Sequence, residues 1–88
     1  MEYRSLGRTG LKVSEICLGT MTFGLYTKEA EADRMLGLSM DAGVNFIDTA
    51  NAYIGGKSET ILGNTLGARR EEVVLATKFF NPMGSGPN

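Results

Sequence analysis

Residues 41–53 read Asp41-Ala42-Gly43-Val44-Asn45-Phe46-Ile47-Asp48-Thr49-Ala50-Asn51-Ala52-Tyr53, and this stretch decides the fold. Within it, the short apolar run 44–47 comes after a helical pattern and a glycine, which predicts a buried β-strand. The run Val73-Val74-Leu75-Ala76 repeats this arrangement 29 residues later in the chain. Strands that alternate with helical segments are typical of a parallel α/β protein.

Three chemically useful side chains follow these two strands. Asp48 and Lys78 hold equivalent places after successive strands, and Tyr53 lies in the loop after the first. Residues at the carboxyl ends of parallel strands are where such proteins usually carry out chemistry. Each residue alone has an ordinary explanation, as a loop aromatic, a solvated lysine or a turn cap. Together they predict a site in which a cation favours the phenolate form and makes a phenol a better acid.

The segment before residue 44 has the signals of an amphipathic helix. We expect Thr27 to be its N-cap, acidic residues to occupy its first turn, and Gly43 to end it in a left-handed conformation. The inward stripe of this helix comprises Ala32, Met35, Leu36 and Met40. A second helix is expected from near Ser58 to Gly67.

The remaining segments complete a β-hairpin followed by βαβαβ. Residues 1–14, with Gly7 and Gly10, predict the hairpin, residues 14–18 the first parallel strand, and residues 73–79 the third. Residues 69–72 are interpreted as a solvated charged turn, and residues 81–88 as neither helix nor strand. Right-handed crossovers place both helices on one face, which leaves the other face, lined by Phe46 or Ile47, uncovered.

Four ordered blocks of the chain resemble the aldo-keto reductases. They are residues 3–14, the run Leu18-Gly19-Thr20-Met21-Thr22-Phe23-Gly24, residues 41–63 with Gly56-Lys57-Ser58-Glu59, and Ala76-Thr77-Lys78. The resemblance implies a (β/α)8 TIM barrel, which needs about 250 residues. We therefore expect residues 1–88 to be the N-terminal segment of a single barrel domain, with the remainder of the barrel outside this chain.

The resemblance also implies roles for individual residues. Tyr53 would donate a proton to the carbonyl oxygen of an aldehyde or ketone, Lys78 would tune that tyrosine, and Asp48 would hold Lys78. Thr20, Met21 and Asp48 match positions that contact the nicotinamide side of NADP(H), although Met21 replaces a frequent aromatic residue. The chain contains no histidine, so the histidine of the family's catalytic set is absent from it. The preference for NADP over NAD rests on the resemblance alone.

Two other functions stay open at this stage. The same motifs fit regulatory subunits that resemble these enzymes, such as the potassium-channel β-subunits, and the chain could also be a catalytically incomplete or self-associating fragment. Turnover of a model aldehyde separates the first alternative from an enzyme.

Composition narrows the class of protein. A net charge of −1 offers no basic surface for nucleic acid, and no apolar run reaches the ~20 residues of a membrane span. We see no signal peptide and no metal-ligand pattern, and expect a cytoplasmic protein acting on a small carbonyl compound. Cys17 is the single cysteine, and its apolar neighbours predict a buried structural thiol.

Overall fold

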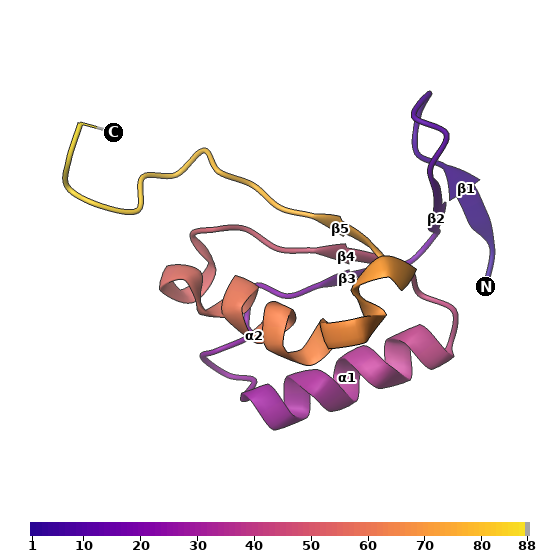
Figure 1. Cartoon of the computed structure of the whole chain (residues 1–88), viewed down its shortest axis with the longest axis horizontal. Coiled ribbons are helices and arrows are strands. Elements are labelled where there is room, and N and C mark those ends of the chain that lie inside the picture. Colours follow the sequence, from indigo (N-terminus) through magenta and orange to yellow (C-terminus); the bar gives the residue numbers. More distant parts are fainter. Residues whose placement is uncertain (88) are drawn as a thin grey trace.

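A computed structural model describes residues 1–87 of the chain. In chain order its elements are β1 (Tyr3–Ser5), β2 (Lys12–Ser14), β3 (Cys17–Gly19), α1 (Glu29–Asp41), β4 (Phe46–Asp48), the 3₁₀-helix η1 (Tyr53–Gly56), α2 (Lys57–Leu66), the 3₁₀-helix η2 (Gly67–Glu72) and β5 (Val74–Ala76). Strands β1 and β2 form an antiparallel hairpin, and β3, β4 and β5 form a parallel sheet in that order. Both helices cover one face of the sheet (Figure 1). The predicted hairpin followed by βαβαβ is confirmed, and no closed barrel forms within residues 1–87.

The parallel strands are shorter than the sequence predicts, with three residues each. Ser14 belongs to the hairpin, so the first parallel strand begins at Cys17, and the third ends at Ala76 before the predicted boundary at Phe79. The ladder nevertheless continues as single hydrogen bonds beyond the strand ends. Thr20 N donates to Asp48 O at 3.1 Å, Thr49 N to Ala76 O at 2.8 Å, and Asn51 N to Lys78 O at 3.0 Å. These bonds hold the carboxyl ends of all three strands together.

The core lies between the sheet and the two helices. Its fully buried large side chains include Phe23, Leu36, Ile47 and Leu62, and the predicted stripe of α1 contributes Ala32 as well. Because side chains alternate along a strand, Ile47 points toward the helices while its neighbours point to the opposite face. The expectation that Ile47 could line the uncovered face is therefore wrong, and Phe46 takes that place.

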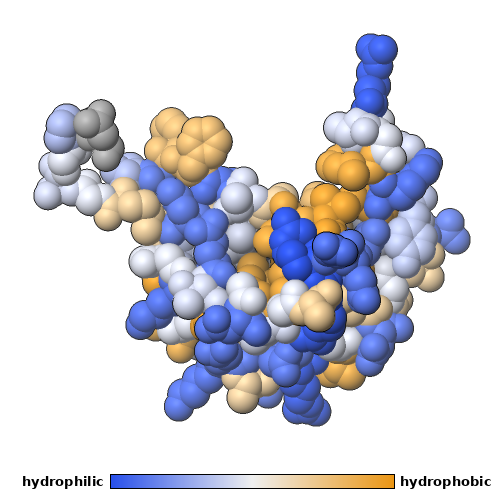
Figure 2. Space-filling view, viewed as in Figure 1, coloured by the Kyte–Doolittle hydropathy of each residue, from blue (hydrophilic) through white to orange (hydrophobic). Residues whose placement is uncertain are grey.

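The opposite face of the sheet carries exposed or half-exposed side chains. Cys17 pairs with Phe46 in the sheet register and is exposed, so the prediction of a buried thiol is wrong. The reason is geometric, because Cys17 alternates with Leu18, which packs against the core, and no element within residues 1–87 covers the Cys17 side of the sheet. Figure 2 shows apolar surface gathered in the hollow beside the hairpin.

Helix α1 begins one residue later than the predicted cap requires. Lys28 is its extended N-cap residue and makes no side-chain capping bond. The predicted cap, Thr27, instead closes the preceding loop, where its carbonyl accepts from Gly24 N at 2.8 Å. Glu29 and Glu31 lie in the first turn, where negative charge favours the helix dipole. At the other end Gly43 adopts a φ of 98°, as predicted.

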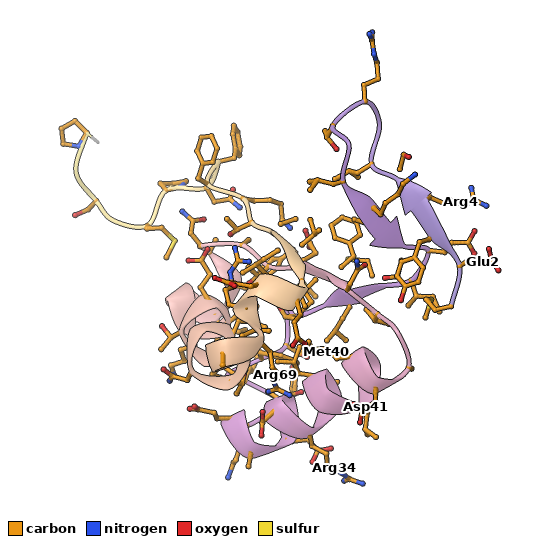
Figure 3. The ribbon with its side chains drawn as sticks, turned by 45° about the vertical axis from the view of Figure 1, so that its right-hand side comes forward. Glu2, Arg4, Arg34, Met40, Asp41 and Arg69 are labelled. Atoms are coloured by element: carbon orange, nitrogen blue, oxygen red, sulfur yellow. The ribbon has the colours of Figure 1, made fainter. Side chains whose placement is uncertain are left out.

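The charged link after α2 is more than a solvated turn. Its residues form η2, and Arg69 Nη2 donates to Asp33 Oδ1 at 2.7 Å and to Thr65 O at 2.5 Å. Figure 3 shows the Arg69 side chain directed toward α1. This arginine therefore ties the two helices together, which the sequence interpretation missed.

The hairpin is fastened to the sheet end opposite the predicted site. Tyr3 donates its hydroxyl hydrogen to Gly43 O at 2.7 Å, and Ser14 N donates to Asn45 Oδ1 at 2.7 Å. The same asparagine donates its Nδ2 hydrogen to Lys12 O at 3.0 Å. The Asn45 side chain thus makes the hydrogen bonds to the β2 backbone that a neighbouring strand would otherwise make. None of the helices in residues 1–87 is long and apolar enough to cross a bilayer.

Candidate active site

Strand ends β4 and β5 bring Asp48 and Lys78 into direct contact. Asp48 is the last residue of β4, and Lys78 follows β5 by two residues. Lys78 Nζ lies 2.7 Å from Asp48 Oδ2 and donates a second hydrogen bond to Thr49 O at 2.8 Å. The lysine side chain is 48% exposed and the aspartate side chain 37%, so the ion pair is open to small molecules.

Tyr53 completes the predicted group from the loop after β4. Its ring centroid lies 4.9 Å from Lys78 Nζ, within the range of a cation–π contact. Tyr53 N donates to Ala50 O at 3.2 Å, which closes the turn that presents the ring. The structure therefore brings together all three residues predicted from the strand pattern.

The backbone after Tyr53 is held in an unusual conformation. Ile54 has a φ of 50°, and Gly55 and Gly56 follow with φ of 62° and 96°. A β-branched residue in this left-handed region is strained, at a cost of about 1–3 kcal/mol. Such strain clusters at functional sites, and here it places the tyrosine at the sheet edge while the chain turns sharply into α2.

Lys78 is held as a cation by its neighbours. The hydrogen bond to Asp48 raises the pKa of Lys78 above its ordinary value of 10.5, and Tyr53 adds to this rise against a smaller opposing effect of desolvation. The ammonium therefore stays positive across the neutral range. Partial desolvation of the Cys17 thiol by neighbouring atoms also raises its pKa, although the residue is exposed, with the negative charge of Asp48 acting in the same direction and Lys78 opposing it.

The residues predicted to contact a cofactor lie around the same edge but differ in access. Met21 is 61% exposed, and Asp48 is half exposed. The Thr20 side chain is fully buried, and its hydroxyl donates to Asp48 O at 2.9 Å. Thr20 therefore stabilises the strand end, and its hydroxyl is not presented to a ligand.

Two contacts that support the site were missed in the sequence. Ser58 is fully buried at the start of α2 and contacts both Thr20 and Thr49. Glu59 Oε1 accepts from Thr77 Oγ1 at 2.6 Å, which ties α2 to the residue before Lys78. A signal existed for the first, because Ser58 lies four residues before Leu62 on the inward face of the helix, where an apolar residue is expected.

A pocket of about 430 Å³ lies beside the strained loop, between Gly56 and Lys57 at the junction of η1 and α2 and Gly24 and Lys28 in the segment between β3 and α1. None of Asp48, Tyr53 and Lys78 lines it. The candidate chemistry is therefore at the open edge of the sheet rather than in this pocket.

Comparison with known proteins identifies the family of the chain. The model of the aldo/keto reductase family matches residues 15–88. An uncharacterized oxidoreductase of Bacillus subtilis is 50% identical over the whole chain, which spans 30% of that relative. A probable voltage-gated potassium channel subunit beta of rice is 46% identical, again over the whole chain and 28% of the relative.

Solved structures show the same relationship. An aldo-keto reductase from Bacillus halodurans, in its holo form, superposes with a TM-score of 0.82 at 39% identity, over 90% of this chain and 26% of that one. A putative aldo-keto reductase from Pseudomonas aeruginosa gives 0.81 at 46% identity, over 88% of this chain and 30% of that one. The chain thus spans about 30% of the length of its relatives and forms part of the TIM-barrel fold that they share. From its motifs, its strand order and these matches, the chain belongs to the aldo/keto reductase family.

Proposed function

We propose that the full-length protein containing this chain is an NADP(H)-dependent oxidoreductase that reduces small aldehydes or ketones to alcohols, with Tyr53 as proton donor. The observation that carries the proposal is the Lys78 ammonium, which lies 2.7 Å from Asp48 Oδ2 and 4.9 Å from the Tyr53 ring centroid. Residues 1–88 would be the N-terminal segment of its single barrel domain. We place the protein in the cytoplasm.

The three residues have complementary tasks in this reaction. Tyr53 would give its hydroxyl proton to the carbonyl oxygen as negative charge develops there. The adjacent Lys78 cation stabilises the phenolate that remains, and Asp48 with Thr49 O keeps that cation in place. The nicotinamide cofactor supplies the hydride when bound, and the protein supplies orientation and the proton.

The strand edge fits a nicotinamide cofactor in two respects. Lys78 donates a hydrogen bond to Asp48 Oδ2, and among residues 1–87 no group donates to Asp48 Oδ1. This second oxygen can therefore accept a hydrogen bond from a hydroxyl group of a ligand. Met21 presents an exposed apolar side chain one residue beyond Thr20, suited to contact with a flat ring. The preference for NADP over NAD is part of the proposal and rests on family membership.

Replacing Tyr53 by phenylalanine in the full-length protein tests the proposal. The variant should lose at least ~10²-fold in carbonyl reduction, because the ring remains while the transferable proton is gone. Its dissociation constant for NADPH, measured by fluorescence titration, should stay unchanged. Tyr3→Phe is the matched control, since it removes a phenol at the opposite end of the sheet and should retain turnover. Near-normal turnover in Tyr53→Phe would remove this residue from the proposed role.

A regulatory subunit is the second candidate function, and the 46% identity to the rice channel subunit favours it. The two candidates make different predictions for one measurement on the full-length protein. An enzyme should turn over a model aldehyde such as 4-nitrobenzaldehyde repeatedly with NADPH, whereas a regulatory homologue should bind NADPH tightly and turn over very slowly.

A further inference from the structure

Ser58 is the centre of a buried hydroxyl cluster beneath the candidate site. Its Oγ lies 2.9 Å from Thr20 Oγ1, 2.9 Å from Thr49 Oγ1 and 2.8 Å from Thr20 O. All three residues are buried, with 0 to 1% of their surface exposed. Figure 1 shows why they meet, because the start of α2 lies at the carboxyl ends of β3 and β4.

We propose that Ser58 is a positioning residue for the Lys78 ammonium, an inference that rests on the proposed function of Lys78. Both groups that hold the ammonium belong to one dipeptide, since Lys78 Nζ contacts Asp48 Oδ2 and Thr49 O. The hydroxyl cluster fixes that dipeptide from below. Thr49 is held through its side chain by Ser58, and Asp48 O accepts from the Thr20 hydroxyl at 2.9 Å.

The number of hydroxyl hydrogens in the cluster shows why Ser58 is required as a hydrogen-bond partner. The three hydroxyls have three hydrogens for four short contacts, counting the bond from Thr20 to Asp48 O. When Ser58 donates to Thr20 O and Thr20 donates to Asp48 O, the Thr49 hydroxyl has Ser58 Oγ as its acceptor. Among residues 1–87 every buried side-chain polar atom has a partner. An alanine at position 58 leaves the buried Thr49 donor without that acceptor, in a place closed to bulk water.

The position of Ser58 is hard to explain by packing or capping alone. It lies on the inward face of α2, four residues before Leu62, where an apolar side chain would bury more hydrophobic surface. It does not cap the helix, because the N-cap is Gly56 and no side-chain capping bond forms there. The Ser58 hydroxyl instead connects the ends of β3 and β4, and the end of β4 carries the two groups that bind Lys78.

The test compares Ser58→Ala with Thr60→Ala in the full-length protein. Thr60 is the matched control, because its hydroxyl also lies in the first turn of α2 but is exposed and bonds only the local carbonyl Gly56 O at 3.2 Å. Ser58→Ala should lower kcat for carbonyl reduction about 10- to 100-fold with KM nearly unchanged, as a small displacement of a catalytic group does. It should also shift the pH profile in the same direction as Lys78→Met, and Thr60→Ala should do neither.

A double-variant cycle separates positioning from a general loss of structure. In a Lys78→Met background, Ser58→Ala should cost less than about 2-fold in kcat, because residues that act through one another are not additive. A full and independent loss in that background would overturn the proposal, as would a normal kcat and pH profile in Ser58→Ala. If Ser58→Ala does not fold, Thr49→Val removes the partner hydroxyl with little change in shape. The same changes in kcat and in the pH profile are then expected of Thr49→Val, and the same results would overturn the proposal.

Hydrogen exchange gives a readout that does not depend on turnover. The amides of Thr20, Thr49 and Asn51 form the bonds that join the strand ends, and they should exchange at least about 10-fold faster in Ser58→Ala than in Thr60→Ala. If the wild-type protein reduces no carbonyl compound, the proposed function fails. The exchange comparison between Ser58→Ala and Thr60→Ala still tests whether the hydroxyl cluster holds the strand ends. Unchanged exchange in an active protein would overturn the role of Ser58 alone.

Discussion

At the scale of single residues, the contact between Lys78 and Asp48 matters more for orientation than for stability. Both side chains are partly exposed, and ion pairs in that setting contribute little to the free energy of unfolding. Their geometry is well defined, however, because Lys78 is held by Asp48 Oδ2 and by Thr49 O at once. A flexible lysine thereby becomes a fixed positive charge beside Tyr53.

Replacing each member of this pair should have a different effect on the pH dependence of carbonyl reduction. Lys78→Met removes the cation that favours the phenolate, so we expect lower activity and an alkaline limb displaced to higher pH. Asp48→Asn keeps the cation, and should mainly weaken its placement and the affinity for NADPH. Initial rates from pH 6 to 10 with both variants provide the measurement. An unchanged profile in Lys78→Met would mean that the two side chains do not share a site.

The sign of the Lys78 shift sets the pH window of the ion pair. A lysine whose pKa is raised on folding stabilises the fold fully below the unfolded value of 10.5, and this contribution is lost as pH rises through the higher folded value. The cation is therefore the predominant form of Lys78 from pH 6 to 10.

At the scale of elements, the contact between the loop after β3 and the start of α2 depends on the absence of a side chain at Gly24. Gly24 has a φ of 100°, and a Cβ built there would lie 2.7 Å from Lys57 Cβ. Gly24→Ala must therefore adopt a strained backbone and push the start of α2 away from the sheet. We expect it to destabilise the full-length protein by about 1–3 kcal/mol.

Gly63→Ala is the control for this prediction, because Gly63 lies within α2 and an added Cβ meets nothing within 4 Å. Alanine favours a helix over glycine by about 0.5–1 kcal/mol, so this variant should be as stable as the parent or more stable. Urea denaturation followed by circular dichroism compares the two. Equal midpoints for both variants would show that the close approach at Gly24 is not required.

The elements also show what the sequence could reveal about this molecule. Apolar runs and the glycine after α1 located the strands and helices, and the end of β4 and the segment after β5 located Asp48 and Lys78, because all these signals are local. The start of α1, the exposure of Cys17 and the role of Arg69 depend on contacts between distant segments. Thr27 has the chemistry of a cap, yet the loop uses its carbonyl instead. The inward position of Ser58 on α2 was a local signal, but its partners Thr20 and Thr49 come from two other segments and show only in the folded structure.

At the scale of the whole molecule, the described residues leave one face of the sheet without a covering layer. Cys17 and Phe46 lie on that face, and the outer edges of β3 and β5 have no partner strand within residues 1–87. Unpaired edges favour association between copies, and a domain this short gains little from hydrophobic burial.

We therefore expect a polypeptide of residues 1–88 alone to be inactive, to bind no NADPH, and to be partly unfolded or aggregated in dilute buffer. Circular dichroism, sedimentation velocity and a fluorescence titration of NADPH would measure these properties. A soluble monomer that melts cooperatively and binds NADPH at micromolar concentration would contradict the prediction, and would make these residues a domain in their own right.

The attachment of the hairpin through Asn45 has a consequence for synthesis on the ribosome. A hairpin forms within about 1–10 μs once its residues are free, but Ser14 must wait for a partner 31 residues later in the chain. At about 5–20 residues per second, translation of that interval takes roughly 2–6 s. During this time β1 and β2 are a nascent segment without a docking surface, exposed to chaperones and proteases. That period ends no earlier than the emergence of Asn45, so the order in which the chain leaves the ribosome sets the earliest time at which the hairpin can be protected.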